Sequence, residues 1–185
     1  IDAGALINQA MNNGVTPLFV ASHEGHVEVI RVLIDAGALI NQAMNNGVTP
    51  LWVASEKGQV EVVRLLMDAG ALINQAMNNG VTPIWVASQN GHLAIVRYLI
   101  LHGSGMEQPD NQGRTPLTIA IARGHADVAE YLASDECKAE VKWQRRKYYA
   151  FVLNSLKNAT VFPGPAFEKV MYTTHDTMYH IASFL

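Results

Sequence analysis

Cysteine is almost absent from this 185-residue sequence, and that scarcity limits its chemistry. Cys137 stands alone, so the sequence offers no internal disulfide and no sign of secretion into an oxidising compartment. We therefore expect a buried or unreactive thiol, and a cytoplasmic or otherwise intracellular location.

Long apolar runs and a strong excess of one charge are also lacking. No apolar stretch approaches the length that spans a bilayer, and no basic segment with an apolar signal core opens the chain, so we expect no membrane insertion. The formal net charge of -3 and the pI near 6.2 argue against a surface built to attract phosphates. Nucleic acid is therefore not an expected partner.

What the sequence does contain is a repeat. Thr-Pro recurs every 33 residues, at 16–17, 49–50, 82–83 and 115–116. Residues 1–18 are identical to residues 34–51, which indicates recent duplication. A period of this length is typical of a solenoid of stacked units. Because the sequence opens on Ile1 inside such a unit, we expect a fragment or an incomplete gene model.

The sequence predicts the same structure at the start of each unit, a hairpin turn followed by a helix. The dipeptide Asn13-Gly14, repeated in the next two copies, accepts positive φ and predicts a finger-like hairpin turn. Thr16 is the expected cap of a first helix, and Pro17 follows it where a missing N–H costs nothing. Gly25 is expected to end this helix so that the chain can reverse.

A second helix is expected from there to Gly37. Its apolar face is predicted at Val29, Val32, Leu33 and Ala36. A helix pair this short cannot bury its own apolar face, so each unit must be covered by the next one along the stack.

Three stretches then carry a family resemblance: Gly-Val-Thr-Pro-Leu at 14–18, Gly-His-Val-Glu-Val at 25–29 and Asp-Ala-Gly-Ala-Leu-Ile-Asn at 35–41. They resemble successive signatures of the ankyrin repeat, over about four copies and roughly the first three quarters of the chain. The resemblance implies an all-α solenoid of helix-turn-helix units joined by hairpin fingers, over residues 1–137. It also implies binding of another protein on the concave finger and first-helix surface, without enzyme activity or a cofactor. We expect a monomer.

The sequence departs from the family pattern at three positions of the unit. The usual histidine after Thr-Pro-Leu is replaced in all four copies, by Phe19, Trp52, Trp85 and Thr118. The usual acidic residue after Gly-Ala is replaced by Leu6, Leu39 and Leu72. The finger aspartate survives as Asp110 and is replaced elsewhere by Met11, Met44 and Met77. The aromatic series is a candidate ligand platform, but the separation of units in such arrays favours burial against the scaffold.

Residues 138–185 are expected to form a C-terminal helical extension. Residues 1–137 carry 6 basic and 13 acidic side chains, net -7, whereas 138–185 carry 7 and 3, net +4, so we expect the two parts to attract. Two apolar stripes at helical spacing predict helices that cap the last repeat. The first stripe consists of Tyr149, Val152, Leu153 and Leu156, and the second, after the breaker at 163–165, of Met178, Ile181, Ala182 and Leu185.

Several residues superficially resemble catalytic, metal or nucleic-acid sites but have simpler structural interpretations. His23 and His26 straddle a helix-breaking glycine, so we expect no metal site. Histidines follow the loop glycine in three copies without any recurring nucleophile, and Gln59 replaces one, so we expect a structural role. The basic run 145–147 is flanked by Trp143, Tyr148 and Tyr149 and is a candidate for single-strand binding, but we favour the exposed face of a capping helix.

The candidate partner-binding residues lie where duplicated copies differ. The pair before the loop glycine, which faces the groove in the family, changes along the chain from His23-Glu24 through Glu56-Lys57 and Gln89-Asn90 to Ala122-Arg123. Met11, Met44 and Met77 are expected to add adaptable apolar contacts on the fingers. Partner selection produces such variation, and so does neutral drift at exposed sites.

Two other functions stay open from the sequence alone. Residues 179–185 weakly resemble the first helix of F-box-like motifs, which would make the chain a substrate-recruiting adaptor. Alternatively, the array is the binding domain of a larger enzyme whose catalytic part precedes Ile1.

Overall fold

The computed structural model describes residues 6–158, and of residue 145 and residues 148–158 only the backbone. The chain divides into two compact units, residues 1–145 and 146–185. Both predicted apolar stripes of the C-terminal extension, the breaker at 163–165 and the F-box-like segment at 179–185 lie outside the described side chains.

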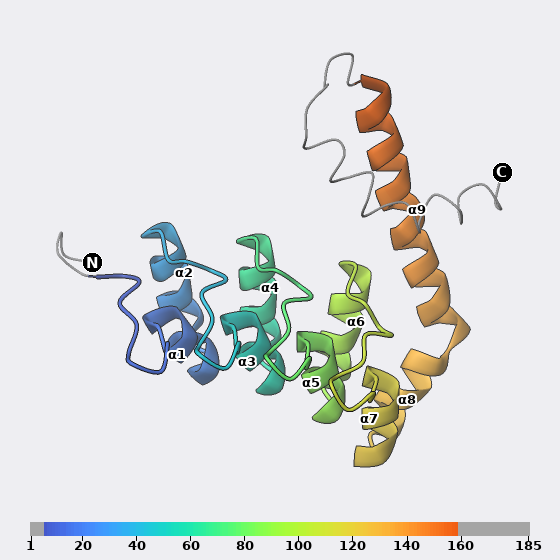
Figure 1. The fold of residues 1–185 in the computed structure, drawn as a ribbon, viewed down its shortest axis with the longest axis horizontal. Helices are drawn as coiled ribbons and strands as arrows, with labels where there is room; N and C mark the ends of the chain where they lie inside the picture. The colour runs from blue at the N-terminus through green and yellow to red at the C-terminus, as the bar shows by residue number, and fades with distance from the viewer. Residues whose placement is uncertain (1–5, 159–185) are drawn as a thin grey trace. The chain divides into compact units, whose positions relative to one another are not determined.

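The first unit is a row of helix pairs, so the prediction of an all-α repeat solenoid is confirmed (Figure 1). Within residues 6–158 the structure has helices and no strands. The first helices of the pairs, here called inner, are α1 (Pro17–Glu24), α3 (Pro50–Glu56), α5 (Pro83–Gln89) and α7 (Pro116–Arg123). The second helices, here called outer, are α2 (Val27–Asp35), α4 (Val60–Asp68), α6 (Leu93–Leu101) and α8 (Ala126–Ala133). A longer helix, α9 (Asp135–Asn158), follows.

Each inner helix begins as the sequence predicts. The Thr16 hydroxyl accepts a hydrogen bond from the Phe19 N–H at 3.1 Å, and Thr49, Thr82 and Thr115 cap the next three inner helices in the same way. Proline occupies the first helical position, where the missing N–H has no partner to lose.

The glycine between inner and outer helix is required for two reasons. Gly91 has a φ of 74°, in the left-handed region that favours glycine. A Cβ at this position would also lie 2.5 Å from Nδ1 of His125, because the next copy packs directly on the loop. The same approach brings His92 against Gly58, so the turn doubles as a contact between copies.

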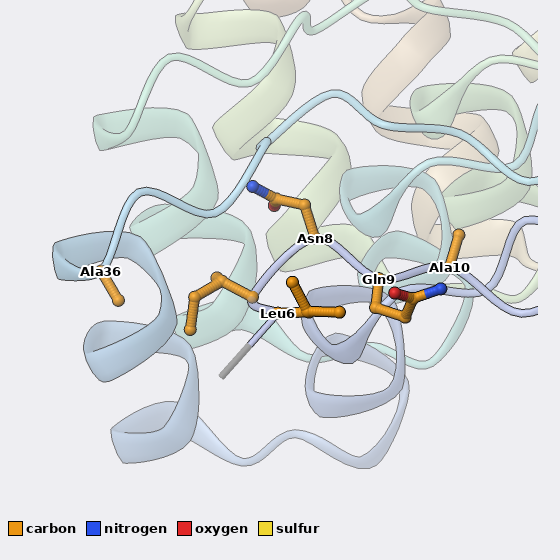
Figure 2. Close-up of a pocket in the computed structure, with 6 residues that line it drawn as sticks. Leu6, Asn8, Gln9, Ala10 and Ala36 are labelled. Atoms are coloured by element: carbon orange, nitrogen blue, oxygen red, sulfur yellow. The ribbon is translucent and has the colours of Figure 1, made fainter. Parts of the chain in front are cut away.

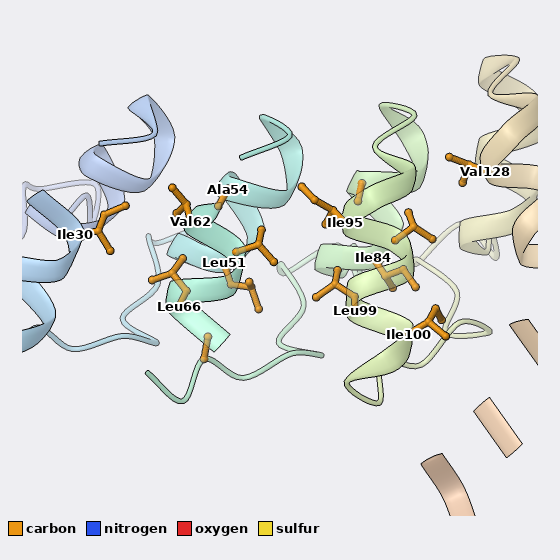
Figure 3. Close-up of a cluster of buried hydrophobic side chains, with 14 of the residues drawn as sticks. Ile30, Leu51, Ala54, Val62, Leu66, Ile84, Ile95, Leu99, Ile100 and Val128 are labelled. Atoms are coloured by element: carbon orange, nitrogen blue, oxygen red, sulfur yellow. The ribbon is translucent and has the colours of Figure 1, made fainter. Parts of the chain in front are cut away.

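The core runs through the whole stack without interruption. Inner helices pack on inner helices and outer helices on outer helices from one copy to the next. Figure 3 shows the buried side chains between these layers, among them Leu51, Ile84, Leu99 and Val128. Each copy therefore contributes half of every interface that it shares with a neighbour.

The predicted apolar face of the first outer helix is wrong in part. Val29 and Val32 are each 50% exposed and Ala36 is exposed, whereas Ile30 and Leu33 are buried. Residues in the register of Val29 are buried in every later copy, with Val62 1%, Ile95 0% and Val128 0% exposed. Helical spacing identified an apolar face that is buried where another copy precedes the helix. No copy precedes α2 within the described residues, so Val29 is exposed there.

Asparagine side chains link successive fingers and loops. Asn45 donates its side-chain N–H to the Asn12 carbonyl at 3.0 Å, and its backbone N–H bonds to the Asn13 carbonyl at the same distance. Asn78 and Asn111 repeat this arrangement in the next two copies. The bonding asparagine recurs every 33 residues in the sequence, but its role becomes visible only when the neighbouring finger is in place.

A second asparagine series clamps the loop that follows each outer helix. The Asn8 side chain donates to the Gly37 carbonyl at 3.2 Å and accepts from the Leu39 N–H at 2.8 Å. Asn41 binds the Gly70 carbonyl and the Leu72 N–H in the same way. Asn74 accepts from the Gly105 N–H at 3.1 Å, so the loops after α2, α4 and α6 are each held by an asparagine of the copy before.

The first turns of α9 pack on the last two outer helices. Cys137 is fully buried, with its Sγ 3.8 Å from Sδ of Met106, and burial raises the pKa of the thiol, which favours its neutral form. Val141 packs against the same core, and Glu136 forms an ion pair of 2.9 Å with Arg97. The first compact unit extends to Arg145, so the expected boundary at 137/138 falls inside α9.

The tryptophans pack into the scaffold at their repeat positions. Trp85 is 3% exposed among Val81, Val86 and Ile119, and its indole N–H donates to the Arg114 carbonyl at 2.8 Å. Trp52 is half-buried and donates to the Val81 carbonyl at 3.1 Å. Each indole thus bonds to the finger of the next copy, which supports a structural role.

Truncation after Ser134 should lower the free energy of unfolding by about 2–4 kcal/mol, because it exposes the core that Cys137 and Val141 cover. Truncation after residue 145 is the matched control, since it keeps the whole first unit. Urea denaturation of both truncated chains measures the difference. Equal stabilities for the two would contradict a capping role for the first turns of α9.

Trp85→Ala should destabilise the chain by about 3–5 kcal/mol, the usual range for a buried tryptophan. Trp52→Ala should cost clearly less, because that indole is only half-buried. Trp85→Phe keeps most of the ring and removes the bond to Arg114, so it should cost about 1 kcal/mol plus a packing loss. Denaturation midpoints that do not separate the two alanine variants would argue against this burial order.

Candidate protein-binding surface

The groove pairs lie at the C-terminal ends of the inner helices. Glu56 and Gln89 are the last residues of α3 and α5, and Lys57 and Asn90 cap these helices. His23-Glu24 closes α1, and Ala122-Arg123 closes α7. The inner helices stack in order along the array (Figure 1), so the four pairs at their ends form one row, here called the groove row.

Neighbouring members of the groove row are linked through the backbone of α3. The Asn90 side chain donates to the Glu56 carbonyl at 3.3 Å, and a ring nitrogen of His92 lies 2.9 Å from the same oxygen. The first member of each pair is half-buried in copies one to three and the second member is exposed. The structure therefore brings the eight residues of the row into register and leaves half or more of them accessible.

The charges of the row are arranged as neighbouring pairs. Nδ1 of His23 lies 2.6 Å from Glu24, and Nζ of Lys57 lies 3.6 Å from Glu56. With neutral histidine the formal charge of the pairs runs from -1 in the first copy through zero in the second and third to +1 at Arg123. Such exposed pairs contribute little to stability, so their charges are available to a partner.

The methionines of the fingers are not equally accessible. Met11 is 66% exposed, whereas Met44 and Met77 are partly buried. Met77 packs against the cluster that contains Val81 and Trp85. Met44 and Met77 are less accessible than Met11 because each lies against the finger of the copy before it, and their role in partner binding stays a prediction. Met11 keeps the exposure that the expectation requires.

The fingers hold their shape in two ways. In the fourth copy, the Asp110 carboxylate accepts bonds from the N–H groups of Gln112 and Arg114 and from the Arg114 guanidinium at 2.6 Å. Burial alone would raise the pKa of Asp110, but these bonds from Arg114 and Gln112 hold it below its usual value. In the copies where methionine replaces this aspartate, the asparagine two residues later takes over the role. The side-chain oxygen of Asn46, for example, accepts a hydrogen bond from the Val48 N–H at 3.2 Å.

The histidines after the loop glycine have structural partners. A ring nitrogen of His125 lies 2.9 Å from the Gln89 carbonyl, as that of His92 does from Glu56. Each ring thus ties one inner helix end to the next copy, as the structural interpretation predicts. His26 is exposed. In the described part of the chain, no group of three or more histidine, cysteine or carboxylate side chains is placed to hold a metal ion.

A shallow pocket lies at the N-terminal end of the described array (Figure 2). It is lined by Leu6 to Ala10 and by Ala36 at the end of α2. None of these side chains is ionisable or nucleophilic, so the pocket offers no acid, base or nucleophile. Among the helices within 6–158, none has the length and apolar character needed to cross a bilayer.

The exposed cluster on α9 is described only in part. Trp143, Arg146 and Lys147 are exposed, and the side chains at 145, 148 and 149 lie outside those that the structure describes. Its interpretation as the solvated face of a helix stays a prediction.

Comparison with known proteins supports the repeat assignment. A family model described as ankyrin repeats in three copies matches residues 2–77 and 71–142. No curated protein matches the chain. Ankyrin repeats generally mediate contacts between proteins and are typically non-enzymatic. The period, the capped helix pairs, the stacked loops and a match over most of the sequence agree, and this chain belongs to the ankyrin-repeat family.

Proposed function

We propose that this chain is a scaffold that binds a polypeptide partner along the groove row and the exposed finger residue Met11. The first support is the place at which duplicated copies differ. Between residues 14–46 and 47–79, formal charge changes only at His23/Glu56 and Glu24/Lys57. The other differences between these two stretches, such as Phe19/Trp52, Ile30/Val63 and Ile34/Met67, keep the formal charge, so the row is where the charge changed.

The charge order of the row supports a partner that binds in one direction. The row runs from net -1 at His23-Glu24 to +1 at Arg123, and its second members are exposed. A partner with basic residues at one end and acidic residues at the other is attracted in one orientation and repelled in the reverse one. Charge then sets the orientation, and the flexible side chain of Met11 adds apolar contact at the first finger.

Three substitutions test this function: Glu56→Lys, Lys57→Glu and Arg123→Glu. They should change the association rate of a partner isolated by affinity capture about tenfold at low salt and less at high salt, because exposed charges act mainly on encounter. The fold should stay intact, since these side chains are at least partly exposed and lie outside the core.

Glu130→Lys on the outer helix α8 is the matched control, because it makes a comparable charge change at an exposed position away from the row. Stopped-flow binding at two salt concentrations compares all four variants. If the row variants associate at the wild-type rate while substitutions at Arg146 or Lys147 abolish binding, the partner sits on α9 and the proposal fails.

A further inference from the structure

Three leucines form an exposed apolar series, one at the start of the described residues and two on the loops after α2 and α4. Leu6, Leu39 and Leu72 occupy one register of the repeat, 33 residues apart, and are 71%, 58% and 58% exposed. The family usually has an acidic residue there, so solvent exposure alone does not call for leucine. We call these residues the leucine row.

Hydrogen bonds fix the backbone of two members of the row. The Leu39 N–H donates to the Asn8 side chain, and the Leu72 N–H donates to the Asn41 side chain, both at 2.8 Å. The copy before each leucine thus holds its loop in place, and the side chain projects from a fixed base. A partner that binds here does not have to order these loops, which lowers the entropy cost of binding.

The spacing of the row argues against a β-strand and is compatible with a helical peptide. Stacked helices lie about 8–10 Å apart, so successive leucines follow at about that interval. Seven residues of an α-helix rise about 10.5 Å and return to nearly the same face. One face of a β-strand repeats at about 6.7 or 13 Å, which matches poorly. Polyproline helices rise about 9.3 Å in three residues, but they dock in aromatic-lined grooves, and this row is aliphatic.

The charges beside the row indicate the partner's polar residues. Asp35 and Asp68 are exposed at the ends of α2 and α4, each four residues before a leucine of the row. Exposed carboxylates at this edge attract lysine or arginine and repel anionic lipid. The row ends in the fourth copy, where glycine stands in the leucine's register at Gly105.

From this arrangement we propose a second interaction surface: the leucine row binds an amphipathic helix that carries apolar residues every seven positions and basic residues beside them. This surface follows the outer helices, whereas the groove row ends the inner helices. The two surfaces are separate, so an experiment can contradict one of the two proposals without contradicting the other.

The test uses a fluorescent peptide of about 22 residues with leucine at every seventh position and flanking lysines. Its binding to the 185-residue chain is followed by anisotropy. A peptide of the same composition with scrambled leucines controls for charge. The Leu39→Asp/Leu72→Asp chain introduces the family's usual acidic residue at exposed positions, so it should fold and melt like wild type.

We expect the patterned peptide to bind the wild-type chain at least about tenfold more tightly than the scrambled peptide, and the double variant to lose at least about tenfold in affinity, because two leucines no longer become buried. Glu56→Lys in the groove row should leave this binding unchanged. Equal affinity of both peptides, or of both chains, would falsify the proposal. Binding to phosphatidylserine vesicles without the peptide preference, or self-association lost in the double variant, would assign the row to a lipid surface or to a second copy and overturn it equally.

Discussion

The burial of one helix pair by the next is the interaction on which everything else in this molecule depends. Val20 in α1 is 44% exposed, whereas Val53, Val86 and Ile119 in the same register are at most 3% exposed. The residues are chemically similar and the local helix is the same, so the difference comes from the neighbour alone. A helix pair of this length acquires a core only when another pair lies against it.

This dependence divides each copy into residues that face a neighbour and residues that do not. The loop glycines and the asparagine side chains meet the adjacent copy directly, so a change there disturbs two copies at once. Exposed side chains such as Lys57 and Leu39 do not, because they project from caps and loops whose backbone the neighbouring copies hold. A substitution at such an exposed position is therefore expected to disturb the fold less than one at a contact between copies.

Much of the fold could be predicted from sequence because its signals are local. The threonine caps, the loop glycines and the 33-residue period each act within one copy, and Cys137 was expected to be buried. The asparagine links and the partial burial of Met44 and Met77 could not be predicted, because both depend on how closely the neighbouring finger approaches. The exposed Val29 and Val32 were misassigned for the same reason, since helical spacing identifies an apolar face but not whether anything covers it.

Matched valine substitutions at the same register of two copies test the dependence on neighbours most directly. Val29→Ala and Val62→Ala remove the same atoms from equivalent positions of α2 and α4, in copies without and with a described preceding pair respectively. Nearest-neighbour burial predicts that Val62→Ala lowers the free energy of unfolding in urea by about 2 kcal/mol, whereas Val29→Ala changes it by less than about 0.5 kcal/mol. Equal losses for the two variants would contradict it, because each pair would then be stabilised by its own contacts.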